Sequence, residues 1–208
     1  MPGPFRGSDL EKAVAAHDHA VATARPEDCK EGSTSIRVNA LLDRAPELAA
    51  ILTHQPLLDA AAALIGGPFK LSACHARSIR PGAAAQALHQ DVAPGQDGWP
   101  LLGFIFMIDP FQLENGATQF LPGSADLREL PEEPPPSSLE YACGPAGSLL
   151  LFDGSVWHGH SANITVRWRR SVQGALIPKG ATAAANHRIY LRPEVWSALA
   201  PEARLLME

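Results

Sequence analysis

Residues Gly147–Ile177 read GSLLLFDGSVWHGHSANITVRWRRSVQGALI, and this stretch gives the clearest indication of the fold. Short apolar runs, separated by glycine and polar turns, predict strands at 147–152, 156–158 and 166–177. Strands this short and this closely spaced are typical of an antiparallel β-protein.

The chain before this stretch has the same character from Phe69 onward. Apolar and polar residues alternate in Phe69–Ile79, which predicts a strand with one buried face. Further strands are expected at 86–91 and 117–121, and the continuous apolar run 101–108 predicts a strand that is buried on both faces. This pattern amounts to about eight strands.

Helical patterns lie at both ends of the chain. Ser8-Asp9-Leu10-Glu11 has the form of a capping box and predicts a helix that continues to about Thr23. The apolar spacing predicts helices at 41–53 and from Pro56 to Ile65. A last helix is expected to begin near Pro193 and to continue to about Leu206.

Helices on either side of a run of strands predict a mainly β fold with flanking helices, built as a jelly roll or a small barrel. The 208 residues suit a single domain. Its expected parts are a helical N-terminal flank (1–67), a jelly-roll core (68–178) and a C-terminal helical tail (179–208). The proline-rich segment within about 123–140 is interpreted as a loop insertion in the core, because neither half alone would keep enough strands to close a sheet.

Composition excludes several classes of protein. The formal net charge of −5 argues against nucleic-acid binding, because nucleic-acid-binding domains usually carry a basic stripe. The apolar runs are shorter than the ~20 residues that span a bilayer, and the first residues lack the apolar segment of a secretory signal. The three cysteines are odd in number and far apart, which favours a reducing compartment, and we expect a cytoplasmic protein.

A candidate metal site begins at His89-Gln90-Asp91. In a strand, residues two apart lie on the same face, so His89 and Asp91 can bind one metal ion together. His158, at the end of a later apolar strand, offers a third ligand. Two histidines and a carboxylate on one face of an iron ion leave three positions open, as in non-haem Fe(II) oxygenases. The alternative interpretation is a surface histidine and aspartate at the end of a strand.

Arginines follow the third candidate ligand. A 2-oxo acid that chelates the metal needs its far carboxylate fixed, and arginine does this best, through two parallel hydrogen bonds. Arg167 and Arg169 would share one face of the strand after His158, and Arg170 would point the other way. The alternative interpretation is a solvated edge of the sheet, which is usual for a run of charges.

Three segments together resemble the phytanoyl-CoA dioxygenase (PhyH-like) family of Fe(II)/2-oxoglutarate oxygenases: ALHQDV (87–92), ENGATQFLPGS (114–124) and PAGSLLLFDGSVWHGHSANITVRWRRSV (145–172). The resemblance extends over roughly Val38 to Leu206. It implies a double-stranded β-helix (jelly roll, cupin-like) core. It implies these site residues: the iron ligands His89, Asp91 and His158, the 2-oxoglutarate anchor Arg169, and the further 2-oxoglutarate contacts Gln86 and Thr118.

The same resemblance implies an oxidoreductase that uses Fe(II), 2-oxoglutarate and O2. Such an enzyme oxidises, and most often hydroxylates, a C–H bond of a small natural-product or lipid-like molecule, with release of succinate and carbon dioxide. One alternative is a cupin-like metal enzyme that does not use 2-oxoglutarate, for which Arg169 would be dispensable. Another is a catalytically inactive jelly-roll binding protein. The expected oligomeric state is a monomer or a homodimer.

The chain departs from the family pattern in one motif. Most members have Pro-Gly-Ser-His where this chain has Ala125 after Ser124. Asp91 is retained, whereas halogenating relatives replace the carboxylate with a small residue, so halogenation is not expected. His160 competes with His158 as the third ligand; His158 is preferred because it directly follows the apolar strand and aligns with the family.

The remaining polar residues receive simpler interpretations. Four side chains are candidates for the substrate pocket: His75, Arg77, Phe104 and Trp157. His17 and His19 lie two apart on a predicted helix, where they do not face each other, and are expected on a solvated face. His54 and His187 lie next to turns and are expected to have structural roles.

Overall fold

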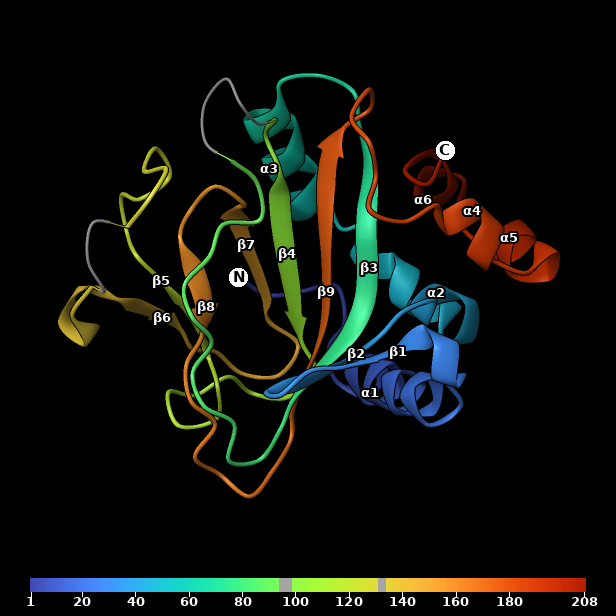
Figure 1. The fold of residues 1–208 in the computed structure, drawn as a ribbon. Coiled ribbons are helices and arrows are strands. Elements are labelled where there is room, and N and C mark those ends of the chain that lie inside the picture. Colours follow the sequence, from blue (N-terminus) through green and yellow to red (C-terminus); the bar gives the residue numbers. More distant parts are fainter. Residues whose placement is uncertain (94–98, 131–133) are drawn as a thin grey trace.

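In a computed structural model, which describes residues 1–93, 99–130 and 134–208, the chain forms two antiparallel sheets with helices on one side (Figure 1). The large sheet has the order β1-β2-β3-β9-β4-β7 and the small sheet the order β6-β5-β8. The strands are β1 Cys29–Glu31, β2 Ser35–Val38, β3 Phe69–Ile79, β4 Leu102–Met107, β5 Thr118–Phe120, β6 Glu140–Ala142, β7 Leu149–Asp153, β8 His158–His160 and β9 Arg169–Pro178.

The helices lie against the large sheet, on the side away from the small sheet (Figure 1). They are α1 Ser8–Ala22, α2 Leu41–Arg44, α3 Gln55–Ile65, α4 His187–Tyr190, α5 Pro193–Ala198 and α6 Pro201–Leu205, with short 3₁₀ turns at Pro26–Asp28 and Pro46–Ile51. Another 3₁₀ turn, Pro136–Ser138, precedes β6 of the small sheet. Among the described residues, no helix combines the length and the apolar character that crossing a bilayer requires.

Successive side chains of the central strands face alternately the main core and the cavity. Phe104 and Phe106 of β4, with Val172 and Leu176 of β9, are buried in the main core beneath the helices. The intervening residues face the small sheet, where Ile105 and Met107 pack in a second apolar cluster with Phe111 and Ala117. β4 is therefore buried on both faces, as its continuous apolar run predicts.

Several predicted helices differ from those observed. α1 begins as predicted, but Ser8 lies inside it, Gly7 takes the cap position and no side chain caps the helix, so the capping-box prediction is wrong. The expected helix 41–53 is broken before Pro46, because proline disfavours the α conformation in the residue that precedes it. Pro201 divides the predicted last helix in the same way.

Three predictions about strands are also wrong. The strand expected at 156–158 is displaced to His158–His160 (β8), because residues 154–157 form the turn that follows β7. Residues 86–91 do not form a strand; one isolated bridge, between His89 and His158, joins this segment to β8. The N-terminal flank 1–67 is not wholly helical, because β1 and β2 form a hairpin within it. Both strands are short and β2 pairs along β3, so the hairpin depends on a distant partner. In the expected loop insertion, residues 131–133 lie outside the described part of the chain.

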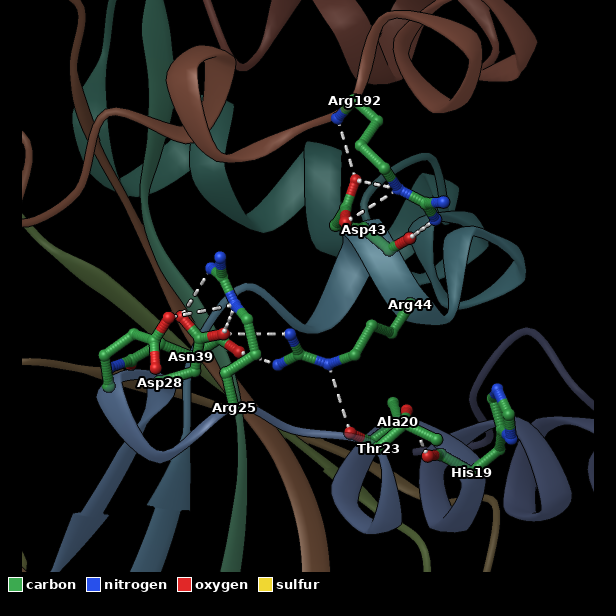
Figure 2. A network of polar contacts seen from close by, with 10 residues as sticks. His19, Ala20, Thr23, Arg25, Asp28, Asn39, Asp43, Arg44 and Arg192 are labelled. Atoms are coloured by element: carbon green, nitrogen blue, oxygen red, sulfur yellow. Dashed lines mark hydrogen bonds and ion pairs between the residues drawn. The ribbon is translucent and has the colours of Figure 1, made fainter.

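A network of polar contacts joins the hairpin to α1 and α2 (Figure 2). Arg44, at the end of α2, donates hydrogen bonds to the Asp28 carboxylate (3.0 Å) and to the Ala20 carbonyl (3.1 Å). The Asp28 side chain is only 6% exposed, and Arg25 is its second partner at 3.0 Å. The network therefore fixes the start of the hairpin that carries β2.

Replacing Arg44 with alanine is expected to lower the free energy of unfolding by about 2–3 kcal/mol. The change leaves the buried Asp28 carboxylate with Arg25 alone, so the loss is somewhat smaller than for a fully unpaired buried charge. Urea unfolding measures it. Lys12→Ala is the matched control: Lys12 pairs with Asp9 at an exposed site, and no measurable change is expected. Equal effects of the two substitutions would contradict the assigned role of Arg44.

Candidate metal centre

Two segments meet at the edge of the small sheet and bring the three predicted ligands together. His89 and His158 exchange backbone hydrogen bonds, each 2.9 Å long, and the amide of Asp91 donates to the Gly154 carbonyl at 2.8 Å. These bonds hold the segment that contains residues 86–91 against β8, although the segment is not a strand. The predicted triad is thus assembled by backbone contacts from two remote stretches of chain.

The three side chains converge on one point. The Asp91 carboxylate oxygens lie 3.9 Å from Nε2 of His89 and 3.7 Å from Nε2 of His158. One ligand atom from each residue lies within 4.8 Å of the others. Since metal–ligand bonds to imidazole and carboxylate are about 2.0–2.2 Å long, one ion can reach all three atoms.

Both imidazoles have the orientation that a metal ligand needs. The Nδ1 atom of His158 donates to the Val156 carbonyl at 2.9 Å, and that of His89 donates to the Ala87 carbonyl at 3.3 Å. A carbonyl accepts only, so each ring carries a proton on Nδ1, and in the neutral imidazole the Nε2 lone pair is then the one that can bind a metal. Backbone partners of this kind are the usual support for metal-binding histidines.

His158 is buried, and aromatic rings surround it. Phe152 and Phe120 lie with their ring centroids 4.7 Å and 5.9 Å from the imidazole. Burial lowers the pKa of His158, which favours the neutral form that binds metals. Asp91 and His89 are about one-third exposed, at 39% and 37%, so the centre is open on their side.

His160, the competing candidate, already has partners for both ring nitrogens. Its Nδ1 donates to the Ser161 carbonyl at 2.8 Å, and its Nε2 accepts from the Thr34 hydroxyl at 3.2 Å. Burial lowers the pKa of His160 to about 4, so the ring is neutral. The contact with Thr34 joins β8 to the β1–β2 hairpin, and His160 is not part of the cluster of ligand atoms.

A cavity of about 300 Å³ extends from the triad between the two sheets. The predicted residues that line it are the triad, Gln86, Thr118, Arg169, His75, Arg77 and Phe104. The ring of Phe104, however, packs over Gly174 in the main core, so its side chain faces the helices. Trp157 lies outside the cavity: its indole donates to the Leu127 carbonyl at 2.8 Å.

Arg169 is a buried cation in the cavity wall. It is 1% exposed and donates to the Gly116 carbonyl at 2.8 Å, and Phe111 lies 4.0 Å below the guanidinium. Its Nε has no hydrogen-bond partner among the described residues, and its side chain forms no ion pair with any of them. Burial lowers the pKa of Arg169 to about 9, so it remains a cation at neutral pH. A buried cation with an unsatisfied N–H fits an anionic ligand.

The other two arginines of the predicted run lie elsewhere. Arg170 points to the helix side, where it contacts Asp109 and Asp18 at 2.6 Å. Arg167 is exposed and precedes β9. The structure also corrects the expectation of a solvated face for His17, which is 1% exposed and bonds to Asp18 beneath β9.

The turn with the unusual Ala125 supports the strand that leads to His158. Ser124 is fully buried; its hydroxyl accepts from the amide of Trp157 at 3.0 Å and donates to the Leu121 carbonyl at 2.6 Å. The serine of the motif therefore positions the backbone next to His158, and Ala125 follows as a half-buried residue.

Two polar side chains of the cavity, Arg37 and Gln173, were missed by the sequence reasoning. Arg37 lies on β2 and Gln173 on β9, and both line the cavity. Gln173 lies two residues from Ser171 and four from Arg169, so alternation along a strand could have indicated it. Arg37 could not be found in this way, because β2 itself was not predicted.

Gly159, between the two histidines of β8, allows the close approach of the ligand-bearing segment. A Cβ at this position would lie 2.9 Å from the Gln86 carbonyl oxygen and 3.3 Å from that of Ala87. Both atoms belong to the backbone, so they cannot move aside without displacing His89.

Gly159→Ala is expected to weaken Fe(II) binding by about 10-fold or more, since changes that move a ligand through its support typically cost that much. Anaerobic Fe(II) titration measures the affinity. Gly67→Ala is the control, because a Cβ there meets nothing within 4 Å. Unchanged affinity in Gly159→Ala would show that the segment is less closely fitted than this contact implies.

Comparison with known proteins confirms the family resemblance: the profile of phytanoyl-CoA dioxygenase (PhyH) matches residues 8–171. The chain belongs to the PhyH family. Dioxygenase af480 of Aspergillus fumigatus is 33% identical over 132 residues, which cover 58% of this chain and 42% of that protein. This PhyH chain spans about half the length of curated relatives such as this one.

Solved structures confirm the predicted jelly-roll fold of this PhyH protein. HygX from Streptomyces hygroscopicus, with nickel and 2-oxoglutarate bound, has a TM-score of 0.71 at 15% identity, with 88% of this chain and 83% of HygX covered. The epimerase SnoN, in complex with Fe3+, alpha ketoglutarate and nogalamycin RO, has a TM-score of 0.69 at 19% identity, with 86% and 77% covered.

Proposed function

We propose that this PhyH protein is an Fe(II)- and 2-oxoglutarate-dependent dioxygenase that oxidises, by default hydroxylates, a C–H bond of a small molecule. One observation carries the proposal: a cluster of two Nε2 lone pairs and one carboxylate shares a cavity with a buried, unpaired arginine. The donor set suits Fe(II), and the cation suits the far carboxylate of 2-oxoglutarate.

In this proposal His89, Asp91 and His158 hold the metal, and residues 1–208 form one catalytic domain. Bound iron, with oxygen and 2-oxoglutarate, would supply the oxidising chemistry: one oxygen atom enters the substrate and the other enters succinate, with loss of carbon dioxide. The protein contributes the ligand geometry, and Phe120 and Phe152 shield the buried imidazole from water.

Arg169 would bind the far carboxylate of 2-oxoglutarate, and Thr118 and Gln86 would contact the cosubstrate from the small sheet and the adjoining segment. Thr118 is 4% exposed and faces the same cavity. A cupin-like enzyme that makes no use of 2-oxoglutarate would have no need of an unpaired cation at this depth. An inactive binding protein would have no need of the two oriented imidazoles.

We further propose a natural-product or lipid-like substrate. The structures of HygX with hygromycin B and of SnoN with nogalamycin RO support a small-molecule substrate for this fold.

The three free cysteines support a reducing compartment such as the cytoplasm, and burial raises the pKa of the Cys74 thiol to about 12, which leaves it unreactive.

The test uses the purified protein under anaerobic conditions. Addition of Fe(II) and 2-oxoglutarate together is expected to produce a weak visible charge-transfer band, and replacement of 2-oxoglutarate by succinate should abolish the band. Admission of oxygen is then expected to convert 2-oxoglutarate into succinate only in the presence of iron. If neither the band nor succinate appears, the proposed function is wrong.

A further inference from the structure

A pair of arginines lines the cavity in addition to Arg169. Arg37 of β2 and Arg77 of β3 are direct partners in the antiparallel pairing of these strands, and both line the cavity. Side chains of directly opposite residues project from the same face of a sheet, so two cations lie side by side here. Like charges in this arrangement destabilise a sheet unless an anion lies between or near them.

Neither arginine of this pair has a carboxylate partner among the residues that the structure describes. The Arg77 guanidinium donates to the amide oxygens of Gln86 at 3.1 Å and of Gln173 at 3.4 Å, both of which are neutral. Arg37 is exposed at the mouth of the cavity, and its side chain makes no hydrogen bond or ion pair with any residue that the structure describes.

Arginines elsewhere in the fold differ from this pair. Arg44 binds Asp28, Arg170 binds Asp109 and Arg192 binds Asp43, each within 3.0 Å. Pairing with a carboxylate is thus the common arrangement for structural arginines of this chain. Arg37 and Arg77 lack such a carboxylate partner. Burial lowers the pKa of Arg77 only to about 10, so this side chain is still charged at neutral pH.

The charges of the loaded site leave this pair unneutralised. Asp91 is the one carboxylate among the residues that line the described cavity. If the proposed function holds, the ferrous ion and Arg169 carry three positive charges, and Asp91 and 2-oxoglutarate carry three negative charges. The positive charges of Arg37 and Arg77 then remain for another ligand.

We propose that Arg37 and Arg77 bind a carboxylate of the substrate, so that the substrate is a small organic acid; this inference rests on the proposed function. Arg37 lies at the exposed end, so the carboxylate is held near the mouth and the rest of the molecule extends toward the metal centre. His75 lies on the same strand as Arg77, and its buried Nε2 has no hydrogen-bond partner among the described residues, which offers one more polar contact.

The test compares acids with their amides, which have a similar shape and no charge. Protein loaded with nickel and 2-oxoglutarate is titrated calorimetrically with hexanoate against hexanamide and with benzoate against benzamide. We expect the acids to bind about 10- to 100-fold more tightly than the amides, as charge-assisted bonds to arginine allow. Arg37→Gln and Arg77→Gln should remove this preference, and Arg37→Lys should restore part of it.

Controls separate a binding role from a structural one. Arg167→Gln removes the same charge from an exposed arginine outside the cavity and should leave the acid preference unchanged. Each variant is also tested for thermal unfolding and for binding of 2-oxoglutarate, and Arg37→Gln should retain both. Equal affinity for acid and amide in the wild-type protein, or an acid preference that survives Arg37→Gln, overturns the inference.

Two further arms distinguish other failures. Tighter binding of hexyl phosphate than of hexanoate, lost in Arg37→Gln, would overturn the carboxylate assignment in favour of a phosphate monoester. Failure of the wild-type protein to bind 2-oxoglutarate with nickel would instead overturn the proposed function. The acid–amide comparison is therefore repeated without 2-oxoglutarate, where an Arg37-dependent preference supports the anion site by itself.

Discussion

Asp91→Ala is expected to weaken Fe(II) binding by at least about 100-fold and to abolish 2-oxoglutarate turnover. Loss of a residue that merely supports a ligand costs about 10- to 100-fold, and Asp91 is itself the anionic member of the cluster, 3.7–3.9 Å from both imidazoles. Anaerobic Fe(II) titration and succinate release measure the two effects. Because Asp91 is 39% exposed, the variant should keep its thermal stability.

His160→Ala is the matched control for Asp91→Ala. It removes a neighbouring cavity imidazole whose two nitrogens bind Ser161 and Thr34. The iron affinity of this control should fall far less than that of Asp91→Ala. If the two variants lost iron to the same extent, or if Asp91→Ala kept its iron, the assignment of the ligands would be wrong.

Arg169→Ala is expected to weaken 2-oxoglutarate binding by about 100-fold or more and to leave Fe(II) affinity nearly unchanged. Truncation of one partner of a buried, hydrogen-bonded charge pair has effects of this size. Calorimetric titration of 2-oxoglutarate into the nickel-loaded protein measures the loss, and a parallel titration of nickel measures the metal site.

A structural role for Arg169 must be separated from a binding role, because its side chain also bonds to the Gly116 carbonyl and to Ser171. Arg169→Lys keeps the cation and loses the planar pair of donors, so its affinity for 2-oxoglutarate should lie between those of the wild type and Arg169→Ala. Unchanged 2-oxoglutarate affinity in a folded Arg169→Ala protein would favour a metal enzyme that does not use this cosubstrate.

The alternating and apolar patterns predicted the central strands because the pattern of buried side chains is contained in the sequence of each strand. β3, β4 and β9 lie within the predicted ranges or extend past them by a residue, and each has neighbours on both edges in the large sheet. A strand with two partners has its side chains ordered on both faces, and the two-residue period in the sequence reflects this.

The segments that were wrongly predicted depend on contacts that no local pattern contains. The segment 86–91 was predicted as a strand, but it pairs with β8 at a single bridge and does not form one. β1 and β2 are short, β1 is the edge strand of the large sheet, and β2 exists through its pairing with residues 76–79 of β3. Propensity alone cannot indicate short strands that are held by a distant partner.

The same distinction between local patterns and distant contacts explains which residues of the site could be predicted. His89 and Asp91 were found because they lie two apart in one segment, and His158 because it follows an apolar strand. The strand pattern left Arg167 and Arg169 as alternatives, and the family resemblance singled out Arg169. Arg37 was missed because it lies on the unpredicted hairpin, and Trp157 was misplaced because its ring packs on the turn near Leu127.

Every role proposed for the cavity depends on one iron ion bound by His89, Asp91 and His158. Anomalous diffraction from anaerobic crystals loaded with Fe(II) and 2-oxoglutarate tests it most directly. We expect one iron peak about 2.0–2.2 Å from Nε2 of each histidine and from an Asp91 carboxylate oxygen. An iron peak at another position, or occupied crystals in which Asp91 lies out of reach of the ion, would contradict it.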